Sequence, residues 1–344
     1  MIRPASVKWL PAFAAFLIVL ALAGPLSAQQ ERSPPAGLNP EIVNSIVSLR
    51  AHIAPEGQST DTLGQTRSGN GVIVDASGLV VTIGYLITES YAIEVTLADG
   101  TGVSATFVGY DNETGFGLLR AELPAGARPM RLGNSDQATE GDVALVLTAG
   151  GPLPVLPVKV VSRRDFAGWW EYLLENAIFT SPPQPNFGGA ALVGRDGRLL
   201  GIGSLQVGDA GVPQTHSPGN MFVPINRLKP LLADLIDSGR PAAKGRPWLG
   251  VTTKDSPYGV VIEHTRKDGP AEKAGIRPHD IIVGVGDKRV KDNLEFLRRV
   301  YALGEAGVTV PLVVLRVEGS SGTTQRIEVP SASRYDFMRA SRGL

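Results

Sequence analysis

The sequence predicts a mostly β protein in which antiparallel strands are followed by a smaller module that mixes strands with helices. Short apolar runs alternate with Gly, Asp and Asn along the first part of the chain, a spacing typical of an antiparallel sandwich or barrel. Turn sequences such as DASG, ADGTG and GRDG join these runs. The 344 residues include 41 glycines and 26 prolines but only 6% aromatic residues, which favours a loop-rich β fold over a helical bundle.

The composition excludes several classes of function. Hydrophobic residues make up 43% of the chain and charged residues 19%, enough apolar side chains for a substantial core. The formal net charge is zero, so the charge balance indicates neither a nucleic acid nor a strongly charged substrate. There is no cysteine, which excludes thiol catalysis, disulfides and thiolate metal ligands. The four histidines are scattered, and we expect neither a metal site nor a cofactor.

Residues 1–28 are predicted to be a secretory signal peptide. The start is positively charged, an apolar stretch covers residues 9–24, and PLSAQQ offers a cleavage point after Ala28. The apolar stretch is too short for a comfortable membrane span. We expect an exported, periplasmic protein in which residues 29–40 form a flexible linker. Because Leu26 is larger than the residue preferred near a cleavage point, an uncleaved anchor in the inner membrane is the alternative.

Residues 41–238 are predicted to form the larger, β-rich domain. Its clearest strands are expected at residues 71–75, 79–83, 92–97, 105–110, 143–148 and 157–162. A closing helix is expected over residues 225–239, where apolar residues recur at helical spacing and a glycine follows. The aromatic segment 163–179 is interpreted as a structural plug or loop, with a binding surface as the alternative.

A second module is predicted over residues 248–331, after a linker at residues 239–247. It alternates strands with two short helices, the second of which has Asp292 as its N-cap. Residues 332–344 are expected to be a loose tail. The expected strands are 248–251, 258–265, 308–319 and 325–331, the helices 269–275 and 292–303, and the hairpin 280–290.

Five motifs follow one another in the larger domain. GNGVIVDASGLVVTIGYLI and ADGTGVSATFVGYDNETGFGLLR precede RLGNSDQATEGDVALVLTAG, NFGGAALVGRDGRLLGIGSL and NMFVPIN. This succession resembles the HtrA/DegP-type family of serine proteases. The resemblance covers most of residues 41–330. It implies a trypsin-like double antiparallel β-barrel followed by a C-terminal PDZ domain of the α+β type.

The resemblance places residues without the required chemistry at the family's catalytic positions. Tyr85 stands where the family has its histidine, Gly115 where it has its aspartate, and Phe187 where it has its serine. Phenylalanine has no nucleophilic atom, a tyrosine hydroxyl with an ordinary pKa of about 10 is no base near neutral pH, and glycine has no side chain. Pro185, at the position of an oxyanion-hole donor, has no N–H. The two aromatic side chains either fill the vacated cavity or form a floor for a bound peptide.

The PDZ-like module keeps the parts that bind a peptide in this family. Such a domain adds an extended peptide to a sheet edge and captures its terminal carboxylate with backbone N–H groups. The facing helix contributes residues that could wall a side-chain pocket. The alternative is that these are core residues and the site serves only interdomain packing. The predicted peptide-binding residues are Trp248, Leu249, Gly250, Val251, Leu297 and Val300.

An intact scaffold beside a dismantled catalytic centre predicts a pseudoprotease. It would bind unfolded or C-terminal polypeptide segments as a chaperone-like holder, adaptor or regulator, and we predict no enzyme activity. A homo-oligomer is possible, a nucleic-acid partner is not expected, and no membrane span would remain after signal cleavage. One alternative is an active endopeptidase with a relocated nucleophile at Ser181 and a base at His216. Another is a purely structural component of an envelope complex or oligomer.

Overall fold

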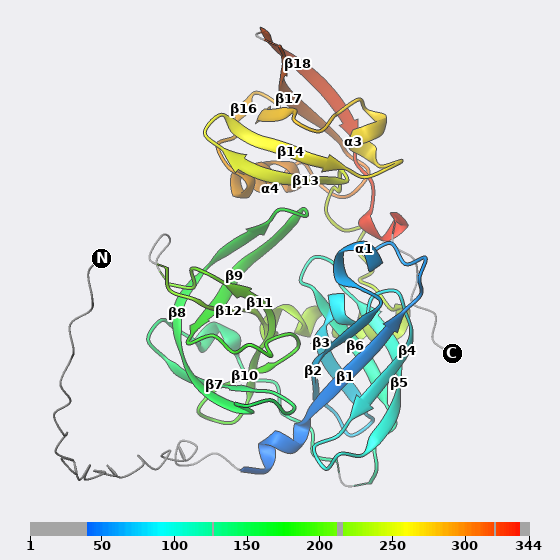
Figure 1. Cartoon of the computed structure of the whole chain (residues 1–344), viewed down its shortest axis with the longest axis vertical. Helices are drawn as coiled ribbons and strands as arrows, with labels where there is room; N and C mark the ends of the chain where they lie inside the picture. The colour runs from blue at the N-terminus through cyan, green and yellow to red at the C-terminus, as the bar shows by residue number, and fades with distance from the viewer. Residues whose placement is uncertain (1–39, 126, 212–215, 320, 338–344) are drawn as a thin grey trace, which may run out of the picture. The chain divides into compact units, whose positions relative to one another are not determined.

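The computed structural model describes residues 40–125, 127–211, 216–319 and 321–337, and Figure 1 colours their strands along the chain. The predicted signal peptide lies outside the described residues. Within the described ranges, no helix has the length and apolar character that a membrane crossing needs. Two closed barrels of six strands each precede a separate third sheet, which confirms the predicted fold class of a double β-barrel followed by an α+β module.

The first barrel has the strand order β1-β2-β3-β6-β5-β4. Along β1, Leu49, Ala51 and Ile53 are buried and Arg50 is exposed, which is the period of two of a strand with one face inward. The elements are η1 (Pro40–Ser45), β1 (Ile46–Ile53), α1 (Thr60–Leu63), β2 (Thr66–Ile73), β3 (Leu79–Ile83), η2 (Gly84–Leu86), β4 (Ser90–Thr96), β5 (Gly102–Tyr110) and β6 (Phe116–Ala121).

The second barrel has the strand order β10-β11-β12-β9-β8-β7. Every residue of β12 is buried, so neither face of this strand alternates with solvent. The elements are η3 (Ser135–Gln137), β7 (Val143–Leu147), β8 (Val155–Gly168), β9 (Tyr172–Ser181), β10 (Ala191–Val193), β11 (Leu199–Val207), β12 (Gly219–Pro224), η4 (Ile225–Arg227), η5 (Lys229–Leu231) and α2 (Leu232–Ser238).

The aromatic segment 163–179 is a β-hairpin, so the interpretation as a plug or loop holds only for the turn that carries Trp169 and Trp170. β8 and β9 stay paired from Lys159 and Ser181 out to Gly168 and Tyr172. Two register shifts interrupt this pairing, and they break the strict alternation by which a strand is recognised in a sequence. Aromatic rings stiffen the end of the hairpin, where the Trp170 ring stacks on Tyr172 with centroids 5.6 Å apart and planes 16° apart.

The helix predicted over residues 225–239 is shorter than expected. Only Leu232–Ser238 is α-helical, and two 3-10 turns precede it. Pro230 lies in the second of these turns, where it has no N–H to give to an α-helical hydrogen bond. The predicted glycine stop is confirmed, because Gly239 takes a left-handed conformation with φ 75°.

The third sheet pairs its strands in the order β13-β14-β15-β17-β18, with β16 beside β15. The N-cap prediction is confirmed, since the Asp292 side chain accepts from the N–H of Glu295. The predicted tail begins with a 3-10 helix, η6 (Arg334–Phe337). The elements are β13 (Val251–Ser256), β14 (Gly259–Thr265), α3 (Pro270–Lys273), β15 (Ile281–Val285), β16 (Lys288–Arg289), α4 (Asn293–Tyr301), β17 (Thr309–Glu318) and β18 (Ser321–Pro330).

The strand predicted over residues 248–251 is mostly a loop. Trp248 forms one isolated bridge with Ala332, and β13 begins only at Val251. Gly250 has φ 79°, which a strand cannot accommodate and which only glycine adopts freely. The chain therefore turns here and directs successive N–H groups to one side.

Candidate functional site

The structure brings the three predicted catalytic positions together. Tyr85 lies in η2, and the N–H of its neighbour Gly84 donates to the carbonyl of Gly115 over 2.7 Å. The Tyr85 hydroxyl lies 3.0 Å from the point that a Cβ on Gly188 would occupy, directly after Phe187. The three positions that the resemblance names therefore lie close together in the fold.

Tyr85 is held as a structural hydroxyl. Its hydroxyl donates to the carbonyl of Ser204 over 3.0 Å, across the two barrels. Burial raises the pKa of the Tyr85 hydroxyl well above its usual value, so the group stays protonated in the physiological range. A protonated phenol cannot take a proton from a nucleophile, and the half-buried Phe187 beside it offers no nucleophile.

Gly115 has no room for a restored aspartate without strain. Its φ is 89°, in the left-handed region that residues with a side chain rarely adopt. A Cβ there would lie 3.3 Å from Ile83 Cδ1 and 3.6 Å from the Tyr172 hydroxyl. The Tyr172 hydroxyl itself donates to the carbonyl of Thr114 over 2.7 Å. The backbone conformation at Gly115 therefore favours glycine over any residue with a side chain.

The loop that carries Phe187 is fastened by Asn70, a residue that sequence reasoning missed. Asn70 is completely buried in β2. Its Nδ2 donates to the carbonyls of Asn186 and Gly188, each over 2.9 Å, and its Oδ1 accepts from the N–H of Ala149 over 2.8 Å. Pro185 in the same loop is exposed and has no N–H. The only available signal was a polar residue inside the apolar run GNGVIVD.

The proposed replacement pair is not joined. Ser181 Oγ donates to the carbonyl of Pro218 over 3.0 Å, and His216 is exposed. A base that activates a serine must accept a hydrogen bond from the serine hydroxyl. Here the Ser181 hydroxyl donates to a backbone carbonyl instead. Across residues 40–125, 127–211, 216–319 and 321–337, no group of three or more His, Asp or Glu side chains could hold a metal ion.

Five of the six predicted peptide-binding residues come together between the start of β13 and helix α4. Leu249 and Val251 share one buried apolar cluster with Leu297 and Val300 of α4, and Gly250 lies between the first two. Trp248 is the exception, because its ring packs on Phe337 with centroids 4.7 Å apart. The cluster lies directly beside a loop of backbone donors.

Those donors converge on one carboxylate, that of Glu171. The N–H groups of Leu249, Gly250 and Val251 donate to its oxygens over 2.7, 2.8 and 2.9 Å. Burial raises the pKa of the Glu171 carboxyl to about 7, although these three donors and the Arg334 guanidinium favour its charged form. The loop is thus a built carboxylate site, and sequence reasoning missed the residue that fills it.

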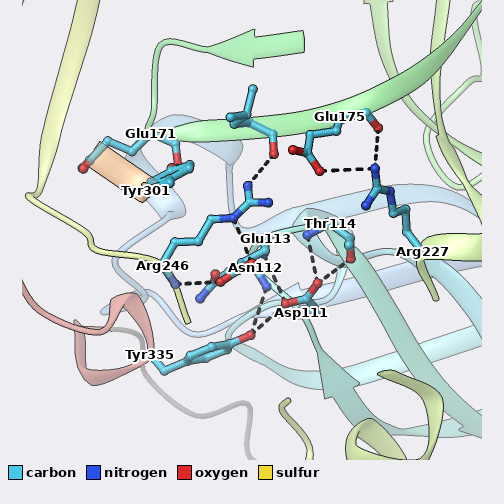
Figure 2. A network of polar contacts seen from close by, with 11 residues as sticks. Asp111, Asn112, Glu113, Thr114, Glu171, Glu175, Arg227, Arg246, Tyr301 and Tyr335 are labelled. Atoms are coloured by element: carbon cyan, nitrogen blue, oxygen red, sulfur yellow. Dashed lines mark hydrogen bonds and ion pairs between the residues drawn. The ribbon is translucent and has the colours of Figure 1, made fainter. Parts of the chain in front are cut away.

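A polar network lies around this contact (Figure 2). Arg246 donates through Nη1 to the carbonyl of Leu173 over 2.8 Å, and its Nε lies 3.2 Å from Oε2 of Glu113. Burial raises the pKa of the Glu113 carboxyl, and Arg246 opposes that effect. Tyr335 of η6 donates to Oδ1 of Asp111 over 3.1 Å. This network fixes the turn before Gly115, and it also shows that the start of the predicted tail is bound.

Two family models match this chain. The model described as "Trypsin-like peptidase domain" matches residues 69–202, and the model described as "PDZ domain" matches residues 247–330. Curated DegP-like and DegS proteins match 81% and 72% of this chain.

The chain belongs to the HtrA/DegP-type family.

Among curated proteins, this HtrA-type chain is 29% identical over 298 residues to a "Probable periplasmic serine endoprotease DegP-like" of Chlamydia muridarum. That match covers 81% of this chain and 56% of the relative. The chain is 28% identical over 265 residues to "Serine endoprotease DegS" of Escherichia coli, covering 72% of this chain and 73% of the relative. It spans about half the length of the DegP-like relatives that it matches.

Solved structures of HtrA-type proteins share the fold. "HtrA-type protease AlgW with tripeptide" superposes with a TM-score of 0.51 at 24% identity, covering 84% of this chain and 94% of that one. "HtrA-type protease AlgW with decapeptide" gives a TM-score of 0.52 at 23% identity, covering 84% and 96%. At this level of identity the likeness concerns the arrangement of strands, and the residues of each site must be judged on their own chemistry.

Proposed function

We propose that this HtrA-type chain is an exported pseudoprotease that binds polypeptide segments through its PDZ domain and acts as a holder, adaptor or regulator. The observation that carries the proposal is the contrast between two loops. Three N–H donors at residues 249–251 meet on one carboxylate, while Tyr85, Gly115 and Phe187 meet without a nucleophile or a base.

The loss of proteolysis follows from how triads work. The three members act as a unit, and removing the nucleophile or the histidine lowers the rate by about a millionfold. An oxyanion hole that lacks one donor loses a further factor of about 10²–10³. This chain has none of the three side chains, and Pro185 supplies no donor. Ordinary serine proteolysis therefore has no route through this site.

Peptide binding is supported by the loop geometry and by the relatives. A ring of N–H groups beside an apolar pocket is the arrangement by which a PDZ domain holds a C-terminal carboxylate and the side chain before it. The two AlgW structures named above were determined with a tripeptide and with a decapeptide. We propose the same class of ligand here, bound through Leu249, Gly250 and Val251 against Leu297 and Val300.

The place of action and the assembly belong to the same proposal. The curated DegP-like relatives are named as periplasmic, and residues 1–28 have the pattern of a secretory signal. A periplasmic pseudoprotease would meet unfolded and newly exported chains there. A homo-oligomer would present several PDZ domains to one such chain and raise its avidity.

The test combines digestion with binding, using the purified chain from residue 29 to residue 344. Casein is incubated with the wild type and with Phe187→Ser. In parallel, a library of fluorescein-labelled decapeptides with four varied C-terminal residues is screened with free and with amidated C-termini. We expect no digestion by either chain and binding only of free carboxylates. Digestion by the wild type that survives Phe187→Ala would overturn the pseudoprotease.

A fluorophosphonate probe addresses the relocated nucleophile separately. This reagent labels activated serines, so an inert chain stays unlabelled. Labelling that disappears in Ser181→Ala would establish the endopeptidase alternative. A library screen without any preference for a free C-terminus would instead favour a structural component.

A further inference from the structure

The tip of the β8–β9 hairpin presents a carboxylate in the manner of a chain end. Glu171 has φ 55°, a left-handed conformation that is rare for a residue with a side chain. It is only 6% exposed, and both of its carboxylate oxygens accept backbone N–H groups of residues 249–251. A strained backbone at a hairpin tip persists only when surrounding contacts hold it, and these contacts lie in the PDZ domain.

The backbone before Glu171 also forms the hydrogen bonds that a bound peptide would form. The carbonyl of Trp169, two residues before it, accepts from the N–H of Thr253 in β13 over 2.9 Å. Trp169 lies two residues before Glu171, and Thr253 lies two residues after Val251. This is the spacing of a strand added to a sheet edge. On the opposite side, Asn293 at the start of α4 donates through Nδ2 to the carbonyl of Gly168 over 3.0 Å. The hairpin tip is therefore hydrogen-bonded to both walls of the groove between β13 and α4.

An apolar side chain of the hairpin completes the contact. Leu173 of β9 is 4% exposed and belongs to the same buried cluster as Leu249, Val251, Leu297 and Val300. Carboxylate, strand-like carbonyl and apolar side chain are the three features by which a peptide C-terminus is recognised. The hairpin supplies all three from within the chain.

We propose that Glu171 is a built-in ligand of the PDZ domain, so that a polypeptide C-terminus binds only after it displaces the hairpin tip. This inference rests on the proposed function, because it concerns the regulation of the same site. Two carboxylates cannot accept the same three N–H groups, and the two states therefore exclude each other. Binding of a peptide and release of the hairpin are one coupled event.

The coupling has a quantitative consequence. An intramolecular competitor lowers the apparent affinity for an external ligand by the fraction of molecules in which the site is open. Because the Glu171 carboxylate belongs to the same chain, it docks without the entropy cost of bringing two molecules together. The closed state is therefore favoured even if each hydrogen bond is weak. Removing the carboxylate should raise peptide affinity, whereas removing an ordinary structural contact would lower it.

Hydrogen exchange tests the contact without any peptide. Wild type, Glu171→Gln and Glu171→Ala are compared over residues 247–253 by mass spectrometry. Glu175→Gln is the matched control, because Glu175 lies in β9 shortly after Glu171, is exposed, and pairs with Arg227 at the surface. We expect exchange to accelerate by about tenfold or more in both Glu171 variants and not in the control. The reason is that the N–H groups of residues 249–251 lose the carboxylate that accepts from them. Unchanged exchange over β15 and β17 shows that the variants remain folded.

Peptide affinity supplies the second readout. The decapeptide from the library that binds Glu171→Gln most tightly is titrated into all four chains by fluorescence polarisation. The inference expects binding to the Glu171 variants to be about tenfold tighter than to the wild type, with Glu175→Gln equal to the wild type. Equal exchange and equal affinity in wild type and Glu171 variants would overturn the inference but leave the proposed function standing. Faster exchange with no peptide bound by any chain would keep the internal contact and overturn the proposed function.

Discussion

The loop at residues 184–189 and the loop at residues 248–251 make an instructive pair. In a trypsin-like fold and in a PDZ domain, the corresponding loops both present backbone N–H groups to an oxygen. Here the first is tied down by its carbonyls, which accept from Asn70, and Pro185 adds no donor. The second keeps three donors on one carboxylate. Binding through the backbone needs little more than one glycine, whereas hydrolysis needs three particular side chains.

Asn70→Ala should give the largest effect of single substitutions at the two loops. The change removes a completely buried side chain that donates to the carbonyls of Asn186 and Gly188 and accepts from the N–H of Ala149, although the backbone N–H of residue 70 still donates to Gly188. We expect the free energy of unfolding to fall by about 2–4 kcal/mol, measured by urea denaturation. Asn226→Ala is the control, because the hydrogen bonds that its side-chain amide donates lie at the exposed surface. Similar losses for both variants would contradict a special role for Asn70.

Gly250→Ala should separate strain from binding. Its φ of 79° makes any side chain costly, by about 1–3 kcal/mol, and a Cβ would lie 3.1 Å from Arg266 Cβ. Gly275→Ala is the matched control, since Gly275 has φ 88° with open space around its Cβ position. We expect both variants to lose stability by thermal denaturation. Only Gly250→Ala should also lose affinity for free C-termini, and an equal loss in both would mean that the loop is not the binding element.

Tyr85→Phe should have a modest effect. The change removes one hydroxyl that donates to the carbonyl of Ser204 and leaves the ring in place. We expect a loss of about 1 kcal/mol in the free energy of unfolding and no change in casein digestion. Tyr258→Phe, at a side chain that is 75% exposed, should change neither. A change in proteolysis with Tyr85→Phe would show that this hydroxyl takes part in chemistry.

The smallest expected effect is a pH dependence of peptide affinity. A released Glu171 carboxyl has an ordinary pKa of about 4.3, and the docked carboxyl has a pKa of about 7. The docked state therefore binds more protons, and docking weakens as pH rises from about 4.5 to about 7. We expect the wild type to bind a peptide a few-fold more tightly at pH 8 than at pH 6.

The groups that face Glu171 do not mask this dependence. The Tyr301 hydroxyl donates to the Glu171 carbonyl, and burial raises the pKa of that hydroxyl, so it does not titrate between pH 6 and pH 8. Peptide affinity should be flat with pH in Glu171→Gln, as fluorescence polarisation can show. An equal slope in the wild type and in this variant would assign the dependence to another group.

The parts of the fold that could be predicted depend on residues that are close together in the sequence. The N-cap at Asp292 and the stop at Gly239 depend on neighbours within a few residues, and both are confirmed. The strand at residues 79–83 has the predicted bounds, because it is an uninterrupted apolar run between turns.

What could not be predicted depends on residues far apart in the sequence. The role of Asn70 comes from carbonyls more than a hundred positions away. The role of Glu171 comes from N–H groups about eighty positions away. The hairpin itself was missed because its bulges hide the alternation of a strand. Motifs predicted three positions that lie close together in the fold, and tertiary contacts revealed which carboxylate accepts from the N–H groups of residues 249–251.

The aromatic side chains at this contact also give the chain an optical reporter. The sequence contains four tryptophans, and Trp9 lies in the predicted signal peptide. The other three are Trp169 and Trp170 at the hairpin tip and Trp248 at the start of the carboxylate loop. After signal cleavage, all intrinsic tryptophan emission would therefore arise where the hairpin meets the PDZ domain. A shift in that emission would follow release of the hairpin without any label.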